Sequence, residues 1–178
     1  MTKIYKTALF CFLIAASFTA CKKNDKNSDS KGNASAILSF DDNGSKVTLN
    51  NCVALDISTG DLKQISITSN ENNGNRNFSI SLIQDITLLK AGDKFTVYND
   101  VFNLPVGSMT MFYSTSATGL FTTQAGNPVG SVTITAVSST EIKGNFSGNL
   151  YDTDDSEGLT LKHKITDGTF TASRSISL

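Results

Sequence analysis

The chain has 178 residues, with 15 basic and 16 acidic side chains and a formal net charge of −1. A charge balance this mild excludes the strongly basic surface that nucleic-acid binding requires. The sequence has only two prolines and no tryptophan. It is rich in Ser, Thr, Asn and Gly between Val, Ile, Leu and Phe, a composition that favours strands and turns over helices.

Residues 1–20 have the layout of a secretion signal. Lys3 and Lys6 precede an apolar run at 7–18, which is shorter than the roughly 20 residues of a membrane-spanning helix. Small residues follow, and then Cys21. The segment resembles a bacterial lipoprotein signal, although Phe18 stands where that signal usually has an aliphatic residue. The resemblance implies cleavage before Cys21 and acylation of its thiol and new amine, which would anchor the chain permanently in a membrane. The alternative is an ordinary cysteine after a signal peptide.

Residues 21–33 are expected to be the lipidated cysteine and a flexible tether. From residue 22 to residue 33 the segment is polar, carries both signs of charge and has no apolar side chain, so nothing in it repays the entropy of ordering. Its composition also resembles the export tag that sends lipoproteins of the Bacteroidota to the outer leaflet of the outer membrane. This implies a lipid-anchored protein at the cell surface or on the periplasmic face of that membrane.

The first half of the domain predicted at residues 34–178 alternates apolar and polar residues, the period of a strand with one buried face. Asn43-Gly44 lies between two such runs and is a strong hairpin signal. The alternation then places a series of apolar residues on one inward face, interrupted by a turn at 58–61. This series comprises Val47, Leu49, Val53, Leu55, Ile57, Ile65 and Ile67.

The second half continues this pattern. Residues 108–115 form a predicted strand with Met109, Met111 and Tyr113 on one side, and residues 116–128 are the longest irregular candidate. Asp167-Gly168 is a second hairpin signal. About ten short strands and no convincing amphipathic helix predict an all-β domain, either an antiparallel β-sandwich or a flattened barrel. The alternation predicts that one face of each sheet meets water.

The C-terminal third contains three motifs: GSVTIT at 130–135, IKGNFSG at 142–148 and ITDGTF at 165–170. In this order they resemble the strands of uncharacterised surface lipoproteins of the Bacteroidota built as all-β domains, in which the last motif is a hairpin. The resemblance implies the fold and the location. It brings no catalytic residues and no cofactor.

Cys52 is the one cysteine expected to remain as a free thiol, because Cys11 leaves with the signal and Cys21 is acylated. It lies in an apparent strand and is predicted to be a buried structural thiol. A nucleophilic role would require a neighbouring base, and His163 is the single histidine.

An acidic turn between two predicted strands has the spacing of calcium-loop oxygens at Asp152, Asp154 and Ser156. Glu157 replaces the glycine that the sharp turn of such a loop needs, and His163 replaces the closing carboxylate. We therefore predict a solvated turn and no metal site.

Two sets of residues are candidates for ligand binding. Tyr98, Phe102 and Phe121 lie in or beside the middle loops, where exposed aromatic rings stack on sugars or dock a protein; alternatively, they fold back and cap one end of the sandwich. His163 and Arg174 have inward parity on strands predicted to face each other. A lone histidine at such a position is usually a hydrogen-bonded residue near the end of a sheet; the alternative hypothesis is that the two residues line a small mouth that receives an anion.

The sequence favours a non-enzymatic surface binding or structural accessory module, monomeric, with a glycan or protein ligand and a membrane anchor. One alternative is a carrier of a small apolar ligand in a barrel cavity lined by Phe78, Phe95 and Phe146. A less favoured alternative is a hydrolase that uses the acidic turn. Its candidate acids are Asp152, Asp154, Asp155 and Glu157.

Overall fold

The computed structural model describes residues 36–57, 59–98, 104–116, 119–123, 129–153 and 160–175. All of them lie within the predicted domain, whereas the predicted signal, Cys21 and the tether lie outside the described residues. None of the described residues belongs to a helix with the length and apolar character needed to cross a bilayer. The strands are β1 (Ile37–Asp42), β2 (Ser45–Asp56), β3 (Gln64–Asn70), β4 (Arg76–Ile83), β5 (Lys94–Val97), β6 (Ser108–Thr115), β7 (Gly119–Thr122), β8 (Gly130–Val137), β9 (Glu141–Asp152) and β10 (Leu161–Arg174).

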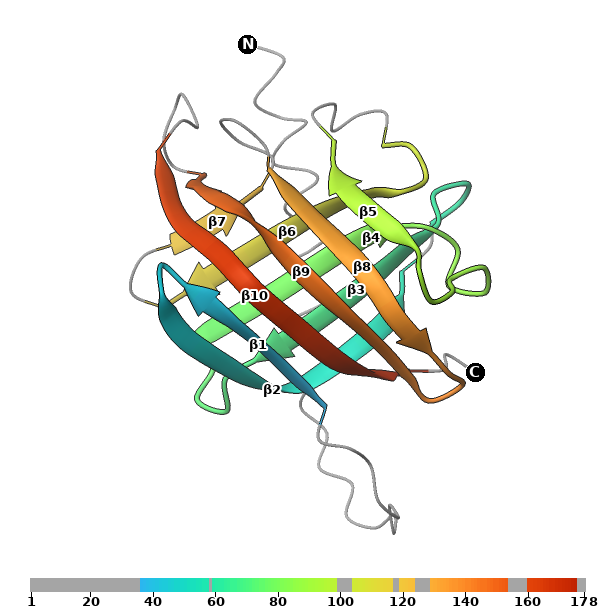
Figure 1. The fold of residues 1–178 in the computed structure, drawn as a ribbon, viewed down its shortest axis with the longest axis horizontal. Helices are drawn as coiled ribbons and strands as arrows, with labels where there is room; N and C mark the ends of the chain where they lie inside the picture. The colour runs from blue at the N-terminus through green and yellow to red at the C-terminus, as the bar shows by residue number, and fades with distance from the viewer. Residues whose placement is uncertain are drawn as a thin grey trace, which may run out of the picture. The chain divides into compact units, whose positions relative to one another are not determined.

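These ten strands form one sheet that closes on itself. β2, β3, β4 and β6 are successive antiparallel neighbours, and so are β8, β9, β10 and β1. The β1–β2 pairing joins the two groups on one side, while the short strands β5 and β7 join them on the other. Figure 1 shows β8, β9 and β10 crossing in front of β3, β4 and β6. The predicted all-β fold, a sandwich or flattened barrel, is confirmed, with short parallel pairings only at β5–β6 and β10–β2 among the described strands.

Aromatic side chains from strands far apart in the sequence meet in the interior, within a core that is otherwise mostly aliphatic. The rings of Phe40 and Phe78 have centroids 4.8 Å apart, and those of Phe78 and Phe146 are 5.3 Å apart. Tyr113 packs on both Phe40 and Phe78 at 5.7 Å. Rings at these separations touch each other, so β1, β4, β6 and β9 are held together by one aromatic cluster.

The hairpin predicted at Asn43-Gly44 is confirmed. β1 and β2 pair from Asp42 and Ser45 outward, and the two turn residues have φ of 51° and 82°. Both central residues of a type I′ turn need positive φ, which Asn tolerates and Gly adopts freely. The turn predicted at 58–61, between β2 and β3, is confirmed for its described residues by the Thr59–Leu62 bridge, and Ser58 lies outside the described residues.

The inward face predicted for the second half of β2 is wrong. Cys52 and Ala54 are fully buried, whereas Val53 and Leu55 are only half-buried. Asn51 has φ of 56°, and the β2–β3 register shifts between Asn50 and Val53. A bulge adds one residue to a strand, so every later side chain moves to the opposite face.

The second predicted hairpin, at Asp167-Gly168, is also wrong. β10 continues through both residues as a single strand. The register shifts there against β9 and against β1, and Asp167 has φ of 50°. The pair therefore forms a β-bulge, in which one residue adopts the same left-handed conformation that a type I′ turn requires.

Three strands depart from the predicted alternation of buried and solvated faces. β3, β4 and β6 have buried residues at most positions on both faces. Ile65, Ile67 and their partners point into the core, and the opposite face carries small buried hydroxyl side chains. These are Ser66, Ser79, Ser81 and Thr110. The prediction that one face of each sheet meets water therefore fails for this part of the ring.

Candidate functional site

Asp42 and His163 form an ion pair or hydrogen-bonded pair between β1 and β10. Nδ1 of His163 lies 2.8 Å from Oδ1 and 2.9 Å from Oδ2 of Asp42. The two side chains are 16% and 15% exposed for His163 and Asp42 respectively, so solvent reaches both. Since an ionised carboxylate only accepts hydrogen bonds, Nδ1 of His163 donates to Asp42.

The two strands that carry this pair are fixed to each other by the β1–β2 turn. Asp42 follows Leu38 and Phe40 on the inward face of β1. The Asn43 side chain then donates Nδ2 to the carbonyl of Lys162 at 2.9 Å and accepts the backbone N–H of Lys164 at 3.0 Å. These two bonds flank His163 on β10 and hold it near Asp42, whose register partner on β10 is Ile165.

Two aromatic rings set the orientation of the imidazole. Phe121 of β7 lies edge-on to His163, with centroids 4.4 Å apart and planes at 64°. Tyr113 of β6 lies 5.1 Å away at 86°. Both rings are almost fully buried. The imidazole is therefore held by Asp42 at one nitrogen and by two ring contacts at its sides.

Tyr113 brings a phenol hydroxyl to the same end of the ring. Its side chain is 1% exposed. Burial is the main cause that raises the pKa of Tyr113, and the negative charge of Asp42 raises this pKa further, while Arg76 lowers it. The hydroxyl therefore stays protonated at neutral pH and is a potential hydrogen-bond donor.

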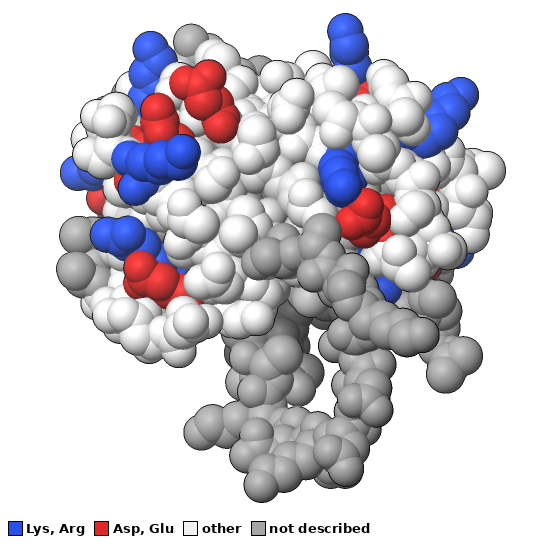
Figure 2. All heavy atoms as spheres, turned by 60° about the horizontal axis from the view of Figure 1, so that its bottom comes forward, with Lys and Arg blue, Asp and Glu red and all other residues white. Residues whose placement is uncertain are grey.

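Charged pairs surround this end of the ring. Arg76 and Glu71 approach to 3.7 Å, and Lys162 and Asp152 also approach to 3.7 Å. Each pair is partly exposed and is worth less than about 1 kcal/mol to stability. On the face drawn in Figure 2, basic and acidic side chains likewise stand beside each other on a mostly uncharged surface. We call Asp42, Tyr113 and His163 the rim site.

The structure brings together two of the residues predicted to bind a ligand, His163 and Phe121. Phe121 is 2% exposed, so it caps the interior and offers no free face for stacking. Tyr98, directly after β5, is 44% exposed. Phe102 lies outside the described residues.

The predicted mouth between His163 and Arg174 is wrong. The two residues lie near opposite ends of the single strand β10, because the expected hairpin between them is a bulge. Arg174 lies instead beside the β8–β9 turn, where its backbone N–H donates to Thr140 and Nη1 donates to the carbonyl of Ser138 at 3.4 Å.

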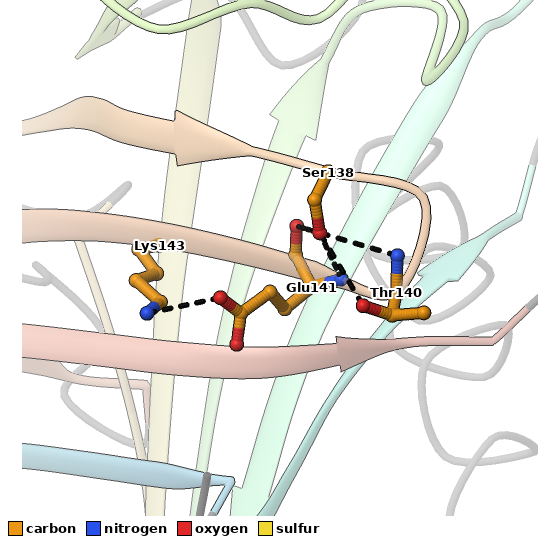
Figure 3. Close-up of polar contacts among 4 residues, drawn as sticks. All are labelled: Ser138, Thr140, Glu141 and Lys143. Atoms are coloured by element: carbon orange, nitrogen blue, oxygen red, sulfur yellow. Dashed lines mark hydrogen bonds and ion pairs between the residues drawn. The ribbon is translucent and has the colours of Figure 1, made fainter. Parts of the chain in front are cut away.

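The β8–β9 turn next to Arg174 is closed by its own hydrogen bonds. The Ser138 hydroxyl accepts the N–H groups of Thr140 and Glu141 at 3.2 and 3.0 Å (Figure 3). The Glu141 carboxylate pairs with Lys143 at 2.9 Å (Figure 3). These contacts account for the turn as a structural element.

The weak metal candidates are only partly described. Asp152 ends β9 and pairs with Lys162, whereas Asp154 and Ser156 lie outside the described residues, as do Asp155 and Glu157. Within the described ranges, no group of three or more His, Cys, Asp or Glu side chains is placed to hold a metal ion.

Cys52 and the aromatic residues proposed for a carrier cavity belong to the core. Cys52 is free and fully buried, and burial raises the pKa of its thiol to about 12, which fits the predicted structural thiol. Phe78, Phe95 and Phe146 are buried. Phe78 and Phe146 pack directly on each other.

Sequence reasoning missed Asp42 and Tyr113 as site residues. The sequence did contain a signal for each residue. Asp42 lies two positions after Phe40, in the same alternating series as Leu38 and Phe40, and Tyr113 lies in the same alternating series as Met109 and Met111. A polar group on an inward parity position indicates either a satisfied buried group or a binding group.

Comparison of this chain with protein-family models, with curated proteins and with solved structures found no match.

Proposed function

We propose that this protein is a lipid-anchored binding or structural accessory module of a bacterial outer membrane, without catalytic activity. The observation that carries the proposal is Cys21 directly after a basic and then apolar segment, followed by a polar stretch at 22–33. In this reading, acyl chains on Cys21 hold the protein at the membrane. The tether precedes the folded domain, whose first strand is β1.

The rim site supports a binding role. Polar side chains from three strands meet at one end of an apolar interior, and binding sites commonly place a few polar groups in apolar surroundings. The interior behind it is packed with touching aromatic rings, which supports a ligand that binds at the rim. A glycan or a protein segment at the cell surface is the proposed partner class.

Mass spectrometry of the N-terminal peptide of protein purified from bacterial membranes tests the anchor. The expected result is cleavage before Cys21 and the added mass of a diacylglyceryl group and an acyl chain. The variant Cys21→Ser is the matched control. It has no thiol to acylate, so its N-terminal region should carry no added acyl mass. An unmodified N-terminus on the native protein, or recovery of the protein in the cytosol, would refute the proposal.

A further inference from the structure

The chain contains two Asn-Gly pairs, Asn43-Gly44 and Asn73-Gly74, whose asparagine side chains are held differently. The first pair lies in the turn between β1 and β2, and the second lies in the turn between β3 and β4. In such a pair the backbone nitrogen of the glycine can attack the side-chain carbonyl carbon of the asparagine, because glycine has no Cβ to obstruct the approach. The rate of this attack depends on how firmly the asparagine side chain is held.

Asn43 is held at both ends of its side-chain amide. Nδ2 donates to the carbonyl of Lys162 at 2.9 Å, and Oδ1 accepts the N–H of Lys164 at 3.0 Å. The N–H of Asn43 also donates to the carbonyl of Lys164 at 3.1 Å. Ring closure would draw Cγ to the Gly44 nitrogen and expel Nδ2, so both side-chain bonds would be lost. Two hydrogen bonds of ordinary strength slow such a step by at least about tenfold.

The hydrogen bonds around Asn73 lie within its own turn. The side chain is exposed. Its Oδ1 accepts the N–H of Asn75 at 3.0 Å, and its Nδ2 has no hydrogen-bond partner among the residues that the structure describes. The N–H of Gly74 donates to the carbonyl of Glu71 at 2.8 Å. Bonds within an exposed turn open at a much lower free energy than strand pairing does, so Asn73 is free to react where Asn43 is not.

We propose that Asn73 is a site of spontaneous modification in the folded protein, whereas Asn43 stays intact. The Gly74 nitrogen loses its proton to solvent and bonds to Cγ of Asn73. The bond between Cγ and Nδ2 breaks, and the amide nitrogen takes a proton from solvent and leaves as ammonia. Water then opens the resulting succinimide ring. Opening at Cγ gives aspartate, opening at the main-chain carbonyl gives isoaspartate, and water is the only co-reactant.

The products differ from asparagine in charge and in backbone length. Both carry a new carboxylate, in a turn where Glu71 and Arg76 lie 3.7 Å apart. Isoaspartate also lengthens the main chain, in a turn where Oδ1 of Asn72 accepts Nδ2 of Asn51 at 3.5 Å. The modified molecules therefore form a second population with a more acidic β3–β4 turn. This inference goes beyond the proposed function and does not depend on it.

Peptide mapping of the purified full chain tests the proposal. The folded protein is aged at neutral pH, samples are digested with trypsin over time, and an unaged sample corrects for the digestion. Cleavage after lysine and arginine puts the two pairs on separate peptides, residues 32–46 and 64–76. Chromatography with fragmentation mass spectrometry distinguishes asparagine, aspartate and isoaspartate at each position. Residue 73 should convert at least about tenfold faster than residue 43.

The same protein in guanidinium chloride is the matched control, because unfolding removes the hydrogen bonds that hold Asn43 and leaves both Asn-Gly pairs in the sequence. There the two residues should convert at similar rates. Asn73→Gln should lose the conversion at residue 73, because the longer side chain closes a ring far more slowly, and should leave residue 43 unchanged. In the folded chain, equal rates at the two positions, or no conversion at residue 73, would overturn the proposal. So would a rate ratio that persists in denaturant, because the difference would then come from neighbouring residues in the sequence and not from the fold.

Discussion

Gly144 of β9 lies directly opposite Phe170 of β10, and a Cβ on Gly144 would be 2.5 Å from Cζ of that ring. The same Cβ would be 2.8 Å from the backbone oxygen of Thr133. Gly148, on the same inner face of β9, gives similar room to Cε of Met111. The glycines of the IKGNFSG motif are therefore required by the close approach of side chains from β10 and β6.

The substitution Gly144→Ala should lower the free energy of unfolding by about 1–3 kcal/mol, the usual cost of overpacking a core. The backbone of β8 and the Phe170 ring both obstruct the new methyl group, so a simple rotamer change does not relieve the clash. Urea unfolding followed by circular dichroism measures the effect. Ser147→Ala, an exposed position on the same strand, should change stability by less than about 0.5 kcal/mol. Equal stability of the two variants would contradict this account.

Strand positions were predictable because most strands keep a period of two, and Asn43-Gly44 marked a true turn. The bulges were not predictable for a physical reason. Asp167-Gly168 suits a tight turn and a bulge equally, since both need a residue with positive φ. Only the continuous pairing of β10 with β9 and β1 selects the bulge. At Asn51 an unpredicted bulge likewise turned Cys52 and Ala54 inward in place of Val53 and Leu55.

The candidate site was less predictable than the fold. The alternation of apolar and polar residues identified His163 as inward-facing. Its partner Asp42, however, is 121 residues away in the sequence. Their contact depends on the pairing of β1 with β10, two strands far apart in the sequence, and no local sequence signal marks this pairing. Arg174 was misplaced for the related reason that a hairpin was expected within β10.

The Asn43 side chain makes a second testable contribution, because its amide bonds to the backbone of β10 on both sides of His163. Asn43→Gly keeps a residue that tolerates the φ of 51° and loses both bonds. It should lower the free energy of unfolding by about 1–3 kcal/mol, as expected for two exposed hydrogen bonds. Denaturant unfolding measures this change.

The control for Asn43 is Asn73→Gly, in the β3–β4 turn, where the Asn73 side chain bonds locally to the N–H of Asn75. It should cost less than Asn43→Gly, because it joins no distant strands. In Asn43→Gly the imidazole resonances of His163 should also shift, because the two hydrogen bonds from Asn43 to the backbone of β10 are lost. If Asn43→Gly changes neither the stability nor the His163 resonances, the two Asn43 side-chain hydrogen bonds do not hold β10 in place.

Asp85 is expected to titrate below the ordinary range for aspartate. Its Oδ1 accepts the Thr87 hydroxyl at 2.7 Å and the Thr87 N–H at 2.8 Å. The hydroxyl bond is the main cause that lowers the Asp85 pKa, followed by the backbone bond, and Lys63 adds a smaller effect. A lowered carboxyl pKa stabilises the folded state above the unfolded pKa, and this contribution is lost as the pH falls through the folded value.

Carbon-13 NMR of the Asp85 carboxyl group during an acid titration tests this expectation. Thr87→Val keeps the backbone donor and removes the hydroxyl, so it should raise the Asp85 pKa toward the ordinary range. Lys63→Gln should raise it by less. An Asp85 pKa that does not change in Thr87→Val would show that the side-chain bond is not its cause.

Cys52 should make stability fall in alkaline solution. Burial raises its pKa from 9.0 to about 12, so the folded chain keeps a proton that the unfolded chain loses. Its contribution is complete below about pH 9 and is lost as the pH rises toward the folded pKa. The slope in this window is about 1.4 kcal/mol per pH unit.

The variant Cys52→Ala isolates this slope, because every other titrating group, including Tyr113 with its raised pKa, is common to both proteins. Urea unfolding from about pH 8 to about pH 11 should show a free energy of unfolding that falls more steeply for the unchanged chain. The slopes of the two curves should become equal below about pH 8, where the thiol is protonated in both the folded and the unfolded state. Parallel curves across the whole range would mean that solvent reaches Cys52 in the folded protein, and alkylation of Cys52 by iodoacetamide without denaturant would then follow, because only an accessible thiolate reacts.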